Sequence, residues 1–147
     1  MAAMISSRGR YALRVLADLA QQSPETFTPL KDIAERQDIS LKYSESIMTV
    51  LSKGGLVEGI HGKGGGYRLS RRPEQYTLGE VLRLTEGSLA PVSCLHEGSA
   101  PCARCNPCPT LPVWEKLEQL VNDYLDSVTL ADVMRTSLPG AKESRSV

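Results

Sequence analysis

Hydrophobic residues recur at helical spacing in three segments of the N-terminal half, and this pattern predicts helices over 8–21, over 30–37 and from Ser40 to Gly54. We expect Thr28 to cap the second helix, with Pro29 in its first turn. The third helix is expected to bury Leu41, Ile47, Val50 and Leu51. The second and third helices are separated by a short turn, which predicts a helix-turn-helix.

Two β-like stretches follow, at 56–60 and 67–70, and the glycine-rich segment HGKGGG joins them. Consecutive glycines permit positive φ angles, so this segment predicts a tight or bulged hairpin. We therefore expect a mostly α-helical protein with a small β-hairpin wing, and residues 1–76 form the predicted winged helix-turn-helix domain.

The C-terminal half predicts a connecting helix, a loop and one long helix. Thr77 and Glu80 have the spacing of a capping box, and Gly87 is expected to end the helix that they begin. No periodicity is present at 94–108, so we expect a loop there. The helix predicted at 112–128 carries an apolar stripe of Val113, Leu117, Leu120 and Tyr124.

The stripe on the 112–128 helix is wide enough to require a partner, so we expect this helix to form a homodimer. Thr129 and Asp132 are expected to begin a last short helix. The second predicted unit therefore covers 77–138, and 139–147 is predicted to be a flexible tail.

Charge is distributed unevenly along the chain. Its 17 basic and 17 acidic residues cancel, but residues 1–72 carry eleven Lys/Arg against seven Asp/Glu, and residues 73–147 carry six against ten. This difference favours a polyanion as partner of the N-terminal half. No apolar run is long enough for a membrane span or a signal peptide, so we expect a cytoplasmic protein.

A winged helix-turn-helix inserts the first turns of its third helix into the major groove of double-stranded DNA. The third helix, with Ser40 at its start, offers five side chains to base edges: Ser40, Lys42, Ser44, Glu45 and Ser46. Phosphate contacts are predicted for Arg8, Arg10, Tyr43, Lys53 and Arg68, and minor-groove contacts for His61 and Lys63. The alternative is an ordinary α+β core with a solvated charged face.

The four cysteines are confined to one short segment, at Cys94, Cys102, Cys105 and Cys108. Clustering of this kind indicates metal ligation or redox chemistry. The C-x2-C-x2-C run before a proline is typical of a 4Fe–4S cluster, and four cysteines equally suit zinc. A dithiol switch is the third reading, although we expect no helix N-terminus there to lower a thiol pKa. His96 is a weaker candidate ligand.

The chain resembles the Rrf2 family of bacterial winged-helix transcriptional regulators in RGRYAL at 8–13, LKDIAERQDIS at 30–40, YSESIMTVLSKGGLV at 43–57 and GKGGGYRL at 62–69. The resemblance continues through TLGEVLRLTEG at 77–87, Cys94, Cys108, Trp114 and TLADV at 129–133. It implies a homodimer in which Glu45 and its neighbours read bases and position 61 enters the minor groove. Family members often have arginine at that position, where this chain has His61.

The resemblance also favours iron–sulfur over zinc. Members that bind a cluster generally use three cysteines and one ligand that is not a cysteine. In some members this ligand is a histidine at the position that Leu111 occupies here, so Cys105 is the expected replacement. The implied function is a repressor that senses redox state, nitric oxide or iron–sulfur status.

Other classes of function fit the sequence less well. A small iron–sulfur carrier has no need of a recognition helix, and a cofactor-free regulator of the same family has no need of clustered cysteines. With two histidines and no catalytic constellation, we expect no enzyme.

Overall fold

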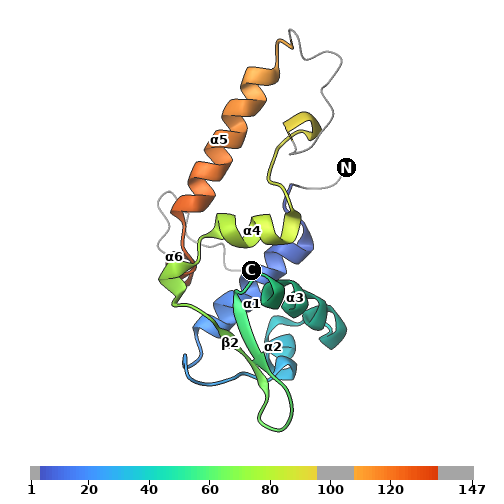
Figure 1. Ribbon diagram of the computed structural model, residues 1–147, viewed down its shortest axis with the longest axis vertical. Coiled ribbons are helices and arrows are strands. Elements are labelled where there is room, and N and C mark those ends of the chain that lie inside the picture. The colour runs from blue at the N-terminus through green and yellow to red at the C-terminus, as the bar shows by residue number, and fades with distance from the viewer. Residues whose placement is uncertain (1–3, 96–107, 136–147) are drawn as a thin grey trace.

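The computed structural model describes residues 4–95 and 108–135. The N-terminal elements are α1 (Ser7–Ala20), α2 (Leu30–Gln37), α3 (Leu41–Lys53), β1 (Val57–Ile60), β2 (Gly66–Leu69) and the 3₁₀ turn η1 (Pro73–Gln75). They are followed by α4 (Leu78–Glu86), the 3₁₀ turn η2 (Ser93–Leu95), α5 (Leu111–Ser127) and α6 (Leu130–Arg135) (Figure 1). The expected fold class, mostly helical with a small hairpin, is confirmed. The helices and strands that were predicted with both bounds begin and end within about one residue of the predicted positions, and the last short helix begins where it was expected.

Two of the three N-terminal helices are capped by serine side chains. Ser6 accepts a hydrogen bond from the backbone of Gly9 at 3.2 Å, and Ser40 accepts one from Tyr43 at 3.0 Å. The predicted cap of α2 by Thr28 is wrong. The N-cap is Pro29 without a side-chain bond, because Thr28 pairs through its backbone with Tyr67 of the wing.

The wing is an antiparallel hairpin in which Val57 is opposite Leu69 and Ile60 is opposite Gly66. Thr28 and Tyr67 exchange two backbone hydrogen bonds of 2.8 Å, so the α1–α2 connection lies along β2. A side chain at Gly66 would collide with the backbone of Thr28, so this close approach requires glycine.

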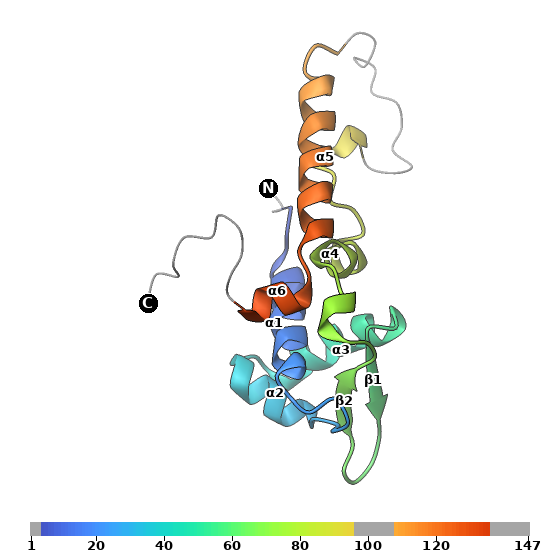
Figure 2. The same ribbon diagram turned by 90° about the vertical axis from the view of Figure 1, so that its left-hand side faces the viewer.

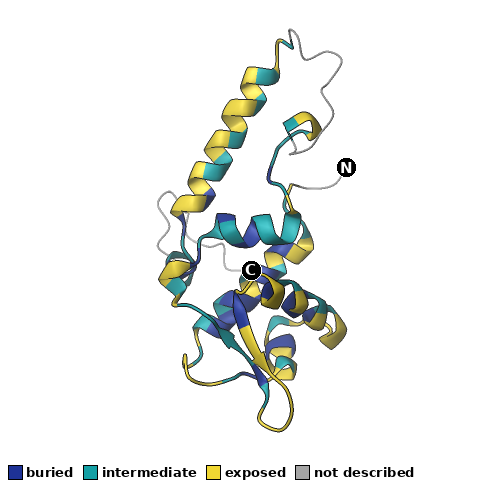
Figure 3. Cartoon of the chain, viewed as in Figure 1, coloured by how far each residue is buried: buried dark blue, intermediate teal, exposed yellow. Residues whose placement is uncertain are grey.

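The main core lies where α1 crosses the helix-turn-helix and the base of the wing (Figure 3). Tyr76 is fully buried there, and its hydroxyl donates to the Leu56 carbonyl at 2.6 Å and accepts from the backbone of Ser70 and Arg71. The same cluster includes Val81 of α4 and Leu130 of α6. The boundary predicted between residues 76 and 77 stays a prediction.

α5 and the wing project toward opposite ends of the molecule (Figures 1 and 2). The C-terminal end of α5 is tied to the body by two backbone bonds of 2.9 Å, from Leu78 to Val128 and from Leu130 to Tyr76. Arg83 of α4 adds a two-pronged ion pair with Asp126, at 2.8 Å for each nitrogen. These bonds set the direction of α5 relative to α4.

Two predicted caps in this half differ in outcome. Thr129 and Asp132 exchange backbone and side-chain bonds of 2.9 and 3.1 Å, as expected for the start of α6. At α4, Thr77 caps as predicted, but Glu80 pairs with Arg71 at 2.7 Å instead of returning to Thr77. The predicted tail at 139–147 lies outside the described residues. No helix in the described part of the chain is both long and apolar enough to cross a membrane.

Candidate nucleic-acid interface and cysteine site

Helix α3, the predicted recognition helix, presents some of its predicted base-contacting residues to solvent and buries one. Lys42 and Glu45 are exposed on its first two turns, and Lys53 is exposed at its end. Ser44 is fully buried, and its hydroxyl donates to the Ser40 carbonyl at 2.9 Å. The prediction that Ser44 contacts DNA is therefore wrong, because this side chain belongs to the core face of the helix.

The prediction for Leu41 on α3 is also wrong. It was expected to point inward, yet its exposed fraction is 49%. The core face is formed instead by Ser44, Ile47, Met48 and Leu51. Leu41 occupies the first helical position, one turn before Glu45, where no neighbouring element covers it. Its exposure therefore places an apolar side chain on the predicted DNA-facing surface.

Tyr43 and Ser46 are half-buried and are fixed by contacts on their own side of α3. Tyr43 meets Tyr11 of α1 edge-on with ring centroids 5.8 Å apart, and Arg14 lies 5.0 Å above the Tyr11 ring. Ser46 donates to the Tyr43 carbonyl at 2.7 Å. Sequence reasoning missed Tyr11 and Arg14, since only the packing of α1 on α3 brings them to this surface.

A buried carboxylate holds α1 against α2. Asp18, which is 6% exposed, accepts two bonds from the Arg36 Nε atom at 3.0 and 3.2 Å, one from Arg36 Nη2 at 2.7 Å, and one from Gln37 at 2.9 Å. The Asp18 bonds raise the pKa of Arg36 above its ordinary value. Arg14 donates to the Gln37 side chain and carbonyl. These hydrogen bonds fix the angle between α1 and α2, the first helix of the helix-turn-helix.

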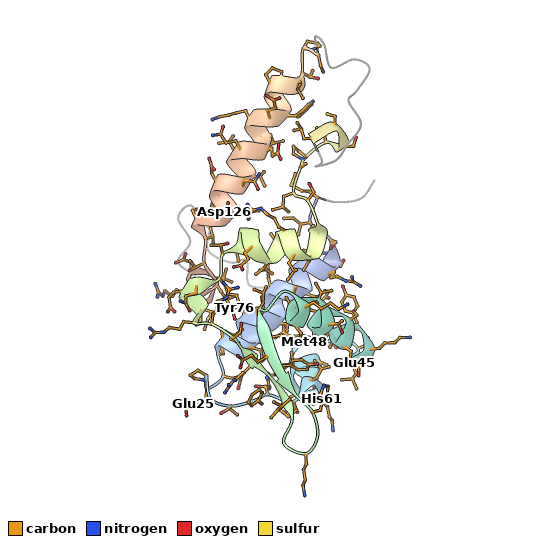
Figure 4. The ribbon with its side chains drawn as sticks, viewed as in Figure 1. Glu25, Glu45, Met48, His61, Tyr76 and Asp126 are labelled. Atoms are coloured by element: carbon orange, nitrogen blue, oxygen red, sulfur yellow. The ribbon has the colours of Figure 1, made fainter. Side chains whose placement is uncertain are left out.

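The wing tip keeps its predicted cationic and ionisable side chains exposed. His61 and Lys63 are exposed between β1 and β2, and Figure 4 places His61 beside the hairpin, away from α5. Arg68 behaves differently. It pairs through its Nε atom with the exposed Glu58 at 3.0 Å and stacks 4.4 Å above the Phe27 ring. The predicted phosphate contact of Arg68 stays a prediction.

The start of α1 is the remaining basic part of this surface. Arg8 and Arg10 are both exposed in its first turn, and Arg10 donates to the Ser7 hydroxyl at 3.2 Å. No acidic residue lies in this first turn. The exposed cations of α1, α3 and the wing can therefore neutralise phosphates, while Glu45 can accept from a base amino group.

The structure describes two of the four cysteines. Cys94 is exposed in η2, and Cys108 is half-buried just before α5; both thiols are free. Cys102, Cys105 and His96 lie outside the described residues. The hydroxyl of Thr110 is 3.5 Å from the Cys108 sulfur, and hydrogen bonds from Thr110 hold the pKa of Cys108 below its ordinary value.

At Cys108, the expectation that no helix N-terminus lies nearby is wrong. α5 begins at Leu111, whose N–H donates to the Cys108 carbonyl. The positive end of its dipole therefore favours a thiolate at Cys108.

α5 leaves an apolar stripe uncovered. Its exposed large hydrophobic residues are Val113, Leu117, Leu120 and Tyr124. On the other side, Leu125 is buried in a cluster with Leu82 and Leu89, and Val121 packs against it. Within the described residues, the helix thus buries one apolar face against its own chain and presents the second to solvent.

The sequence pattern that defines the Rrf2 family, described as an iron-dependent transcriptional regulator, matches residues 5–136. The chain belongs to the Rrf2 family. It is 36% identical over 131 residues to the HTH-type transcriptional regulator IscR of Vibrio campbellii, and the match covers 89% of this chain and 77% of that protein.

Solved structures of Rrf2 regulators have the same fold. The structure of T. potens IscR aligns with a TM-score of 0.69 and 36% identity, covering 90% of this chain and 86% of that one. CymR, the global cysteine regulator of B. subtilis, aligns with a TM-score of 0.74 and 35% identity, covering 94% and 100%. This Rrf2 protein is therefore an IscR-like DNA-binding transcriptional regulator, which is a non-enzymatic function.

Proposed function

We propose that this Rrf2 protein is a homodimeric repressor whose operator affinity responds to redox state, nitric oxide or iron–sulfur status through a 4Fe–4S cluster. The ligands are Cys94, Cys102, Cys105 and Cys108. The observation that carries the proposal is the placement of two free thiols, with Cys94 in η2 and Cys108 just before α5.

The donor set fits the cluster. Thiolates are the usual protein ligands of iron–sulfur clusters, and a short segment can supply several of them at little cost in chain ordering. At Cys108, the Thr110 hydrogen bonds and the N-terminus of α5 both favour the thiolate form. A bound cluster supplies a group that oxygen, nitric oxide or iron shortage can modify or remove.

The partner of the α5 stripe is proposed to be a second copy of the chain. Four exposed apolar side chains along one helix face suit a symmetric crossing of two identical helices, because each copy then covers the other. Such a dimer holds two recognition helices at a fixed separation, as binding to a two-fold operator requires.

Helix α4 provides the physical connection between the cysteines and the DNA-binding surface. Residues 87–95 lead from its C-terminal end directly to Cys94, and Glu86 at that end binds the N-terminus of α1 at Ser6. Arg83 binds α5 through Asp126. A cluster that favours one arrangement of α4 therefore shifts the population of α1 orientations, and DNA that prefers the same arrangement is thermodynamically coupled to it.

The proposed DNA contacts follow from the exposed residues. Bases are contacted by Ser40, Lys42, Glu45 and Ser46, phosphates by Arg8, Arg10, Tyr43 and Lys53, and the minor groove by His61 and Lys63. Zinc bound by the same cysteines is the second candidate. A thiol switch is the third, and the lowered pKa of Cys108 is the observation that favours it.

The decisive experiment starts with protein purified without oxygen. Iron, acid-labile sulfide and zinc are measured together with the absorption spectrum, and a broad band near roughly 400 nm with bound iron and sulfide supports the cluster. Colourless protein that contains zinc, or neither metal, contradicts it. Binding to the upstream region of its own gene is then compared with and without the cluster, and equal affinities would contradict sensing.

Single alanine variants identify the ligands. We expect Cys94→Ala, Cys102→Ala, Cys105→Ala and Cys108→Ala each to lose most of the bound iron while remaining folded, and His96→Ala to retain it. Iron retention in Cys105→Ala with loss in His96→Ala would make His96 the fourth ligand. Retention in both would place the fourth ligand outside this segment.

A further inference from the structure

Exposed apolar side chains fall into three groups. Among the described residues, the large hydrophobic residues in exposed positions are Met4, Leu41, Ile60, Val113, Leu117, Leu120 and Tyr124. Four of these lie on the α5 stripe, and Met4 is the first described residue of the chain. The remaining two, Leu41 and Ile60, lie on the recognition helix and the wing, at the end of the molecule opposite α5.

The position of Leu41 is fixed by hydrogen bonds on both sides of it in the chain. Ser40 caps α3 by accepting from the Tyr43 backbone at 3.0 Å, and the buried Ser44 hydroxyl donates back to the Ser40 carbonyl at 2.9 Å. Leu41 thus begins a rigid first turn, and its side chain remains 49% exposed. The backbone of this apolar residue is thus already placed for contact with a ligand, and only the rotamers of its side chain remain to be ordered on binding.

The neighbours of Leu41 define the surface to which it belongs. Glu45 follows it by four positions, so the two side chains occupy adjacent turns of the same helix side. Lys42 is exposed next to it. A leucine beside a carboxylate, on the turn that is proposed to enter the major groove, meets base edges that are polar with one exception. The C5-methyl group of thymine is the apolar group on that edge of B-DNA.

We propose that Leu41 is a specificity-determining residue that packs against the C5-methyl group of a thymine in each operator half-site. The proposal rests on the assignment of α3 as the recognition helix. Lys42 and Glu45 would then read the polar edges of adjoining base pairs, so that one turn of α3 reads a methyl group beside hydrogen-bonding groups.

The test removes single methyl groups from the DNA. An operator is first selected from random duplexes with the intact protein, and each thymine of the half-sites is then replaced with 2′-deoxyuridine, which lacks the C5-methyl group. Affinities are measured by fluorescence anisotropy at one fixed salt concentration. We expect one thymine position per half-site at which the replacement weakens binding about fourfold, the factor for burial of one methyl group.

The Leu41→Ala variant should bind the thymine and uracil duplexes equally at that position. Ile60→Ala is the matched control, since it removes an equally exposed apolar side chain from the wing, and it should retain the full response. Thermal unfolding of both variants should match the parent protein, because both residues lie outside the core.

Three results would overturn the assignment of Leu41. They are a selected half-site without thymine, an absence of methyl dependence in the parent protein, and a methyl dependence that persists in Leu41→Ala. In each of these the protein still binds its operator, so the proposed function stands. If no duplex is selected at all, both the Leu41 assignment and the proposed operator binding are refuted.

Discussion

Glu86, the last residue of α4, accepts two hydrogen bonds from Ser6, one from its backbone N–H at 3.1 Å and one from its hydroxyl at 2.6 Å. Ser6 is itself the N-cap of α1, whose hydroxyl receives the Gly9 backbone bond. A side chain on Gly9 would collide with the Glu86 carboxylate. One carboxylate at the end of α4 therefore sets the position of the α1 N-terminus, which carries Arg8 and Arg10.

Removing the Glu86 carboxylate tests this connection. Glu86→Ala leaves both Ser6 donors without their acceptor, and we expect a loss of about 1–2 kcal/mol in the free energy of unfolding. The difference in operator affinity between cluster-loaded and cluster-free protein should shrink. Urea unfolding and anisotropy measure the two effects. Glu74→Ala, at an exposed carboxylate, should change neither. An unchanged difference in affinity would place the coupling outside this contact.

A charge on the α5 stripe should separate the proposed dimer. In Leu120→Glu, two like charges meet without partners at the crossing of the helices, so we expect monomers by light scattering and loss of operator binding. Gln119→Glu adds the same charge at an exposed position outside the stripe and should remain dimeric. A dimeric Leu120→Glu protein would mean that the interface lies elsewhere.

Base readout and phosphate contact can be distinguished by their dependence on sequence and salt. We expect Glu45→Ala to change the preferred base at one position per half-site, at a cost of about 1–3 kcal/mol for the original base. Arg10→Ala should weaken binding to all duplexes alike and reduce the salt slope by about one. Binding titrations over a range of salt concentrations measure both. Equal weakening of every duplex by both variants would refute the recognition-helix assignment.

The start of α6 should lose stability in acid. Bonds from the Thr129 backbone and hydroxyl hold the pKa of Asp132 below its ordinary value. A group whose pKa is lowered on folding stabilises the fold fully above its unfolded-state pKa, and this contribution is lost as the pH falls through the folded-state pKa.

Asp132→Asn imitates the protonated carboxyl group. The melting temperature of this variant should therefore lie below that of the parent protein at neutral pH, and the difference should shrink progressively as the pH falls below about 4. A difference in melting temperature that stays constant from pH 7 to pH 3 would contradict this account.

The features that the sequence predicted correctly depend on short stretches of chain. Helical periodicity, the caps at Ser40 and Thr129, the glycines of the wing and the end of α4 at Gly87 involve residues within a few positions of one another. Their backbone conformations follow from local steric and hydrogen-bonding preferences, so no knowledge of the packed chain is needed. The family resemblance likewise rests on contiguous motifs, and it supplied the expected DNA-binding function.

Other features were decided by contacts between segments distant in the chain. Periodicity leaves open whether Leu41 or Ser44 faces the core, because both border the apolar face of α3. The packing of neighbouring elements buries Ser44 and leaves Leu41 exposed. The backbone of Thr28 pairs with the wing strand, so Thr28 does not cap α2, and the pairing of Arg68 with Glu58 joins two strands of the wing.

The sequence by itself thus determined the helices, the wing and the kind of side chains available for DNA and for metal. Only the tertiary structure decided which of these side chains remain exposed, and that Glu86 binds Ser6 across 80 positions. The physical reason is that burial and pairing depend on which surfaces meet when the chain packs, and local propensities leave that choice open.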